Sequence, residues 1–171
     1  STLFPYTTLF RSSNKDRFLR KETLQGFVHD EASAFFGGLA GNAGLFSTAR
    51  DVARVYQMLL NGGEIDGQRY LSKETCQLFT TETSKISRRG LGFDKPDADD
   101  PKKGNCAPAA PAEVYGHTGF TGTCAWVDPM NELVYVFLSN RIYPDVTNRK
   151  LNQLHIRERI QGAIYDAMKK K

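Results

Sequence analysis

The sequence predicts an α+β fold in which an antiparallel sheet is covered by a C-terminal helix and accompanied by a helical part. Three observations predict it. Apolar residues recur at helical spacing over 49–60 and over 148–168, and short apolar runs over 114–138 are separated by turn-forming residues. Helical spacing indicates amphipathic helices, and short apolar runs bounded by turns indicate strands. The chain of 171 residues is long enough for one domain with its own core.

The first element of this fold is a glycine-rich segment over 26–48. It carries Gly37, Gly38, Gly41 and Gly44 among apolar residues. Neither a helix nor a regular strand tolerates glycine at that density. We therefore predict a tight, well-packed loop that leads into the next helix.

Two helices follow this loop, each with a hydroxyl side chain at its start. Thr48 is placed to cap a helix over 49–60 that Asn61 and two glycines end, and Ser72 is placed to cap a second helix that reaches Phe79. Residues 80–112 are mostly polar, with an apolar island at 91–93 that we predict to be a strand. The rest of this stretch is predicted as an exposed loop.

The C-terminal half contributes the sheet and its covering helix. We predict strands over 114–120, 124–127 and 133–138, with a turn at 128–131, and then a helix over 148–168. Its predicted apolar stripe is formed by Leu151, Leu154, Ile160, Ile164, Ala167 and Met168. Its predicted polar side carries Arg157, Glu158 and Arg159.

Charge and cysteine content exclude several classes of function. The net charge is +4 and the pI about 9.0, but the basic residues are scattered, without the clustered stripe that a nucleic-acid surface needs. Cys76, Cys106 and Cys124 have no Cys-x-x-Cys spacing, so neither a disulfide framework nor a zinc site is indicated. No apolar run is long enough to span a bilayer. We expect no nucleic-acid partner, no metal and no cofactor.

The most informative stretch runs from Tyr115 to Arg141. His117-Thr118-Gly119 resembles the Lys/His-Thr-Gly motif of the β-lactamase and penicillin-binding protein-like serine hydrolases, in the branch of class C β-lactamases, DD-peptidases and esterases. The hairpin that leaves the motif and the closing helix continue the resemblance. It implies an α/β sandwich of the β-lactamase/transpeptidase type, here incomplete, with part of the helical subdomain.

The resemblance also implies roles for individual residues. His117 and Thr118 would face the cleft, Gly119 would let the acyl group approach closely, and the Phe120 N–H would be one of two oxyanion-hole donors. Substrate-binding roles would fall to Thr121, Arg141 and His29. For His29 a purely structural role, a hydrogen bond to the loop backbone, stays open, and for Arg141 an exposed position at the end of a strand.

The nucleophile of this family lies in a Ser-x-x-Lys motif that begins a helix. The literal match, Ser12 to Lys15, lacks that context and lies too near the Thr-Gly strand in the sequence. Residues 1–12 resemble the translation of a sequencing adapter, so we expect them to be an artefact and residues 13–171 to be the C-terminal half of the hydrolase domain.

Two functions are compatible with these observations. The first is a β-lactamase-related serine hydrolase that cleaves a peptidoglycan peptide, a β-lactam or an ester through an acyl-enzyme, in which case this fragment, without its nucleophile, is inactive alone. The alternative is a non-catalytic peptidoglycan-binding module of a cell-wall enzyme, fused to a family 3 glycosidase in some relatives. The expected partner is a small-molecule or peptidoglycan-peptide substrate, and the family implies a periplasmic or cell-envelope location.

Overall fold

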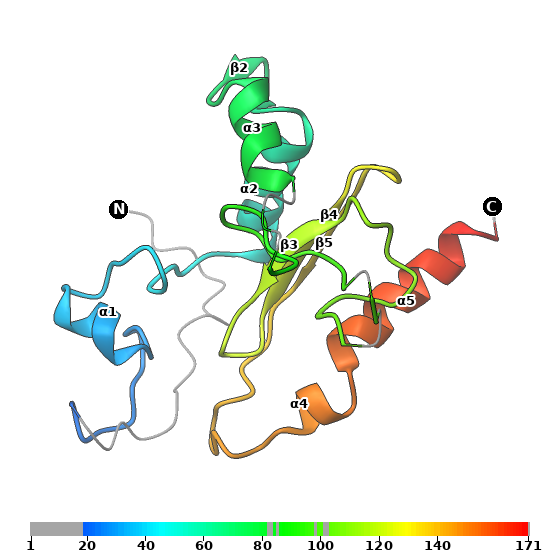
Figure 1. Cartoon of the computed structure of the whole chain (residues 1–171). Helices are drawn as coiled ribbons and strands as arrows, with labels where there is room; N and C mark the ends of the chain where they lie inside the picture. The colour runs from blue at the N-terminus through cyan, green and yellow to red at the C-terminus, as the bar shows by residue number, and fades with distance from the viewer. Residues whose placement is uncertain (1–18, 82–83, 85, 98, 101–102, 171) are drawn as a thin grey trace.

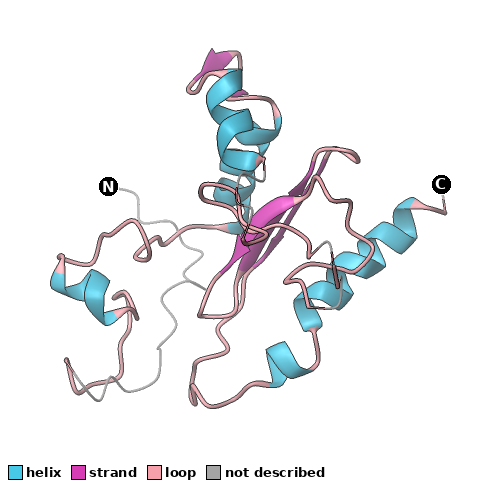
Figure 2. Cartoon of the chain, in the orientation of Figure 1, coloured by secondary structure: helices cyan, strands magenta, loops and turns pink. Residues whose placement is uncertain are grey.

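The computed structural model describes residues 19–81, 84, 86–97, 99–100 and 103–170. A three-stranded antiparallel sheet of order β3-β4-β5 lies between helices, and a two-stranded hairpin, β1-β2, stands apart from it (Figures 1 and 2). Residues 1–12, expected to be an artefact, and the Ser12–Lys15 match both lie outside the described residues, because residues 1–18 are not among them. In chain order the elements are α1 (Glu31–Phe35), α2 (Ala49–Leu60), β1 (Glu64–Ile65), β2 (Gln68–Arg69), α3 (Lys73–Thr80), β3 (Tyr115–Thr118), β4 (Cys124–Asp128), β5 (Leu133–Phe137), α4 (Lys150–Gln153) and α5 (Ile156–Met168).

One face of the sheet is covered by α5. In the register of the strands Gly116 lies opposite Trp126, and Trp126 lies opposite Tyr135, so these positions share a face. The hydroxyl of Tyr135 donates a hydrogen bond of 3.1 Å to the carbonyl oxygen of Arg157 in α5. The predicted packing of the C-terminal helix on the sheet is therefore confirmed.

The other face of the sheet is turned toward α2. Tyr115, the neighbour of Gly116 in β3, points to the opposite face because successive side chains of a strand alternate. Its ring lies 5.3 Å from that of Phe93, which lies 6.1 Å from that of Tyr56 in α2. Helix α2 also packs against β4 and β5. The sheet is thus the middle layer of a sandwich.

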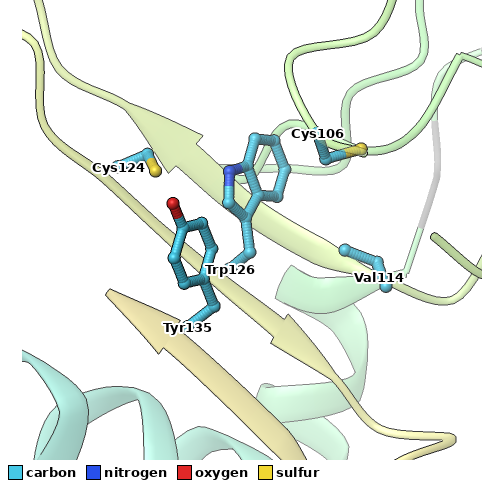
Figure 3. Close-up of a cluster of buried hydrophobic side chains, with 5 residues drawn as sticks. All are labelled: Cys106, Val114, Cys124, Trp126 and Tyr135. Atoms are coloured by element: carbon cyan, nitrogen blue, oxygen red, sulfur yellow. The ribbon is translucent and has the colours of Figure 1, made fainter. Parts of the chain in front are cut away.

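The core lies between the sheet and α5. Figure 3 shows the indole of Trp126 between the side chains of the cluster, with the two cysteines on different sides of it. Ala110, Phe137 and Ile164 pack against this cluster from its border. The buried members of the cluster are Cys106, Val114, Cys124, Trp126 and Tyr135.

The two predicted helix starts are confirmed. The backbone N–H of Asp51 donates to the Thr48 hydroxyl oxygen over 3.1 Å, and that of Thr75 donates to Ser72 over the same distance. Each cap satisfies one of the N–H groups that a helix leaves unpaired at its start. Helices α2 and α3 therefore begin at the residues that the sequence indicates.

The glycine-rich segment differs from the prediction in two ways. It contains a short helix, α1, because Asp30 accepts a hydrogen bond of 2.7 Å from the Ser33 N–H and so caps a turn that the glycine content obscured. It is also not well packed. Four large apolar side chains are between 75% and 85% exposed: Phe35, Phe36, Leu39 and Leu45.

Two further predictions were wrong in detail. The C-terminal helix is broken at His155, whose φ of 48° is left-handed, so α4 and α5 are separate. Arg157 and Glu158 are buried, whereas Leu154 and Ile160 of the predicted apolar stripe are exposed. The break at His155 interrupts the helical periodicity. The apolar stripe that was predicted for one continuous helix therefore does not match the buried face.

The predicted strand at 91–93 does not form. In its place Asp94 makes an isolated bridge to Gly116 on the outer edge of β3. The hairpin β1-β2, which was not predicted, is closed by Asp66 and Gly67, both with positive φ. Among the helices that the structure describes, none is long and apolar enough to cross a membrane.

Candidate active site

The candidate site is built on β3, which forms one edge of the sheet. β4 pairs with one side of β3 over its full length. On the other side Asp94 donates to and accepts from the backbone of Gly116, with distances of 2.7 and 3.0 Å. The bridge covers the edge of β3 at Gly116. The motif begins at the next residue, His117.

His117 and Thr118 are both half-buried at the end of this strand. The register places His117 opposite Ala125 and Thr118 opposite Cys124, on alternate faces of the strand. The Nδ1 atom of His117 lies 2.6 Å from the carbonyl oxygen of Thr118. Since a carbonyl only accepts hydrogen bonds, this contact places the hydrogen on Nδ1 and leaves Nε2 of the neutral ring as an acceptor.

The turn that follows the strand, residues 119–123, has all five of its carbonyl oxygens occupied by donors. Two bonds lie within the turn: the Gly122 N–H donates to Gly119 over 3.0 Å, and the Gly119 N–H donates to Thr123 over 2.8 Å. Nη1 of Arg157 also donates to Thr123 over 3.3 Å. The turn is therefore closed on itself and tied to α5.

The other three carbonyls are bound by the segment that follows β5. Nε of Arg141 donates to Phe120 over 2.8 Å, and the Arg141 backbone N–H donates to Thr121 over 3.0 Å. The hydroxyl of Ser139 donates to Gly122 over 2.8 Å. These bonds turn the carbonyl oxygens of 119–123 toward the protein.

The N–H of Phe120 has no acceptor among the residues that the structure describes. Phe120 is 61% exposed, so this N–H is accessible to water or to a ligand. Next to the strand motif, such a donor is suited to hold a negatively charged oxygen.

The ring of Phe120 contacts the side chains of His29 and Arg141. The imidazole of His29 stacks on it with a centroid distance of 5.4 Å and an interplanar angle of 16°. Cζ of Arg141 lies 4.6 Å from the centroid of the same ring. The structure thus brings together three of the residues singled out in the sequence, from three distant segments of the chain.

The backbone at His29 is held by the side chain of Arg20. Arg20 donates to the carbonyl oxygens of Val28 and His29, over 2.6 and 3.2 Å. The adjacent Asp30 caps α1, and its pKa is lowered by the hydrogen bonds from the Ser33 N–H and hydroxyl. The glycine-rich segment therefore contributes one side chain to the candidate site.

Other groups contribute less. Thr121 is half-buried, and its carbonyl oxygen accepts the hydrogen bond from the Arg141 N–H.

Ser139 and Arg157, which hold the turn, were not predicted, because nothing in the sequence links them to a turn so far away. Within the described ranges no three His, Cys, Asp or Glu side chains converge as metal ligands would.

The sequence contains no Ser-x-x-Lys other than Ser12–Lys15, which lies outside the described residues. Tyr-x-Asn does not occur either. The described residues therefore supply the strand, the turn and their supports. A serine nucleophile of the family's kind is not among them.

Comparison with known proteins agrees with the motif. A sequence model of the family described as Beta-lactamase matches residues 5–158. A protein of Escherichia coli (strain K12), named "Putative D-alanyl-D-alanine carboxypeptidase", is 36% identical over 135 residues, 78% of this chain and 31% of that protein. Proteins of the same name from Salmonella agona (strain SL483) and Salmonella typhi match to the same extent. This chain spans about a third of the length of these relatives. With most of its residues covered by the family match, the chain belongs to the β-lactamase family.

Proposed function

We propose that this chain forms the substrate-binding strand and one oxyanion donor of a serine hydrolase that works through an acyl-enzyme. The observation that carries the proposal is the N–H of Phe120, which follows His117-Thr118-Gly119 and donates to no described residue. The carbonyls around it are bound and turned away. A donor fixed in this manner stabilises negative charge without having to reorient during the reaction.

In the proposed reaction a serine hydroxyl outside the described residues attacks the substrate's carbonyl carbon and loses its proton to a base. The new C–O bond places a negative charge on the carbonyl oxygen, which the Phe120 N–H receives. Collapse of this intermediate breaks the bond to the leaving group, which takes up a proton, and water later releases the acyl group. One such donor is worth about 3 to 4 kcal/mol in the transition state.

His117 is suited to a second role in this site. With the hydrogen on Nδ1, its Nε2 accepts a hydrogen bond or a proton from a substrate group or from the attacking serine. Thr118 and Thr121 remain predicted contacts of the substrate, and Gly119 remains the predicted point of close approach. The name of the relatives favours a peptide ending in D-Ala-D-Ala as the substrate.

A chimera tests this function. The matching segment of the Escherichia coli relative is replaced by this chain, and hydrolysis of a D-Ala-D-Ala peptide, a chromogenic β-lactam and p-nitrophenyl acetate is compared with that of the unmodified relative. We expect the chimera to hydrolyse the substrate that the relative hydrolyses, and this chain alone to hydrolyse none. A folded chimera that binds peptidoglycan without cleaving it would contradict the proposal, as would a burst of product from the chain alone.

A further inference from the structure

Two nitrogens of the Arg141 side chain donate hydrogen bonds to the backbone. Nε donates to the carbonyl oxygen of Phe120 over 2.8 Å, and Nη1 donates to that of Val146 over 3.3 Å. Because the guanidinium group is planar, two bonds from different nitrogens set its orientation. That orientation lays it over the Phe120 ring, with Cζ 4.6 Å from the centroid.

Phe120 needs such support because the protein core does not provide it. Its side chain is 61% exposed, so burial does little to fix its conformation. The two contacts on its faces are Arg141 and the stacked imidazole of His29. The same residue has its carbonyl held by Arg141 and its N–H without a described acceptor. The backbone conformation at Phe120 therefore depends on Arg141 through both the ring and the carbonyl.

The charge of Arg141 is not matched by a carboxylate among the described residues. Burial lowers its pKa, and the neighbouring Arg157 and Arg149 lower it further. A guanidinium group stays charged in a protein. Within this part of the chain Arg141 therefore lies near other cations and binds carbonyl oxygens, not a carboxylate. We attribute its place in the structure to the group that it holds, Phe120.

We infer that Arg141 is a positioning residue, which holds the ring and the carbonyl oxygen of Phe120 and so keeps the Phe120 N–H directed at the reacting oxygen. The inference rests on the proposed function. It differs from direct binding of the substrate by Arg141, because the guanidinium group acts here through Phe120. His29 stacks on the same ring.

The test uses the chimera described above with three variants. Arg141→Met removes the charge and the donors but keeps a long side chain, and Arg141→Lys restores the charge and one donor. Arg159→Gln is the matched control, since it removes an exposed cation of α5 that contacts neither Phe120 nor the turn. The readouts are kcat, KM and the inhibition constant of a boronic acid, which imitates the tetrahedral intermediate.

For Arg141→Met we expect kcat to fall by roughly 10- to 100-fold and the boronic acid to bind more weakly by a similar factor, while KM stays within about twofold, because a transition-state contact is lost. Arg141→Lys should recover part of kcat, and Arg159→Gln should change none of the three. A rise in KM at constant kcat would overturn the inference in favour of direct substrate binding. Equal losses in Arg141→Met and Arg159→Gln, or no loss in either, would also overturn it.

Hydrogen exchange separates this inference from the proposed function. In the chimera, active or not, Arg141→Met should speed exchange of the amides in a peptide covering 119–123, without lowering the melting temperature by more than Arg159→Gln does. An inactive parent chimera with this exchange result would refute the proposed function and leave the positioning contact standing. Unchanged exchange would refute the positioning contact, whatever the activity.

Discussion

Asp94 is bound to Gly116 by two backbone hydrogen bonds, and its carboxylate is bound to the side chains of two other residues of the same loop. Arg88 donates to it over 2.7 and 3.1 Å, and Asn105 donates over 2.8 Å. This one residue therefore ties the long loop 81–112 to the outer edge of β3, directly before His117. Loss of its charge is expected to affect both stability and the motif strand.

Asp94→Asn should destabilise the chain in a pH-dependent way. Burial raises the pKa of Asp94, but the hydrogen bonds from Arg88 and Asn105 outweigh it, so its pKa is lowered in the folded state. A lowered folded pKa gives stability that is present above the unfolded value of about 3.9 and is lost as the pH falls through the folded value. We expect a loss of about 1 to 3 kcal/mol at pH 7 that shrinks toward pH 3.

The measurement for Asp94→Asn is urea unfolding followed by the fluorescence of Trp126, the single tryptophan, at pH 7, 5 and 3. Asp66→Asn is the control, because its ion pair with Arg54 is exposed and should be worth less than about 1 kcal/mol. Equal pH dependence in the wild type and in Asp94→Asn would show that this carboxylate does not titrate against folding.

Gly116→Ala and Gly162→Ala should have opposite effects on stability. A Cβ at Gly116 would overlap the carbonyl oxygen of Ala125 and lie 2.7 Å from Cε3 of Trp126, whereas at Gly162 it would lie 4.0 Å from Cβ of Ala107. We expect the first to cost about 1 to 3 kcal/mol by overpacking. The second should gain about 0.5 to 1 kcal/mol, because alanine is favoured over glycine inside a helix. Two urea unfolding curves decide the matter, and a neutral Gly116→Ala would refute the close packing of β3 on Trp126.

The three cysteines should be unreactive while the chain is folded. Burial raises the pKa of the Cys106 thiol to about 12 and that of Cys124 to about 11, and it also raises that of Cys76. Only a thiolate attacks a disulfide reagent at an appreciable rate. Ellman's reagent at pH 8 should therefore titrate the thiols slowly in buffer and at once in guanidinium chloride. Fast reaction of one thiol in buffer would place that cysteine at the surface.

The exposed apolar side chains of the glycine-rich segment should bind a hydrophobic dye. Phe36 and Leu39 are 77% and 79% exposed, so replacing both with serine removes apolar surface without opening a cavity. We expect weaker fluorescence of anilinonaphthalene sulfonate and less self-association, with the unfolding free energy unchanged within about 0.5 kcal/mol. Leu24→Ser, at a side chain 2% exposed, is the contrasting variant and should be strongly destabilising. A large loss of stability in the double variant would mean that these side chains are packed in solution.

His117→Ala and His117→Lys should show whether the site needs a proton-transferring side chain at this position. Lysine occupies this position in the other form of the motif, so in the chimera His117→Lys should keep activity within about tenfold, whereas His117→Ala should lose roughly 100-fold. The readout is kcat/KM on the substrate of the parent chimera. Full activity of His117→Ala would remove this imidazole from the catalytic groups.

The elements predicted well from the sequence are those whose signals are local. Thr48 and Ser72 mark their helices because a cap lies next to the N–H groups that it satisfies. The three strands likewise follow from apolar runs joined by turn residues. Family membership followed from His117-Thr118-Gly119 for the same reason, since the motif is contiguous.

The features that were missed depend on contacts between distant residues. The break at His155 required a left-handed residue that the apolar spacing does not reveal. The side chain of Arg157 binds the carbonyl oxygen of Thr123, which lies 34 positions earlier. The resemblance assigns His29 and Phe120 to the site, but the sequence does not indicate that their rings stack. Packing decides such contacts, and packing is known only once the elements are assembled.

The contact between His29 and Phe120 has a consequence for the order of folding. The two residues are 91 positions apart, so bringing them together closes a loop whose entropic cost is about 4 kcal/mol. The favourable free energy of this contact exceeds the entropic cost only after the sheet has formed and restricted the intervening chain. Nascent or partly unfolded molecules would therefore carry the motif strand without a fixed Phe120, whose backbone would become ordered only late in folding.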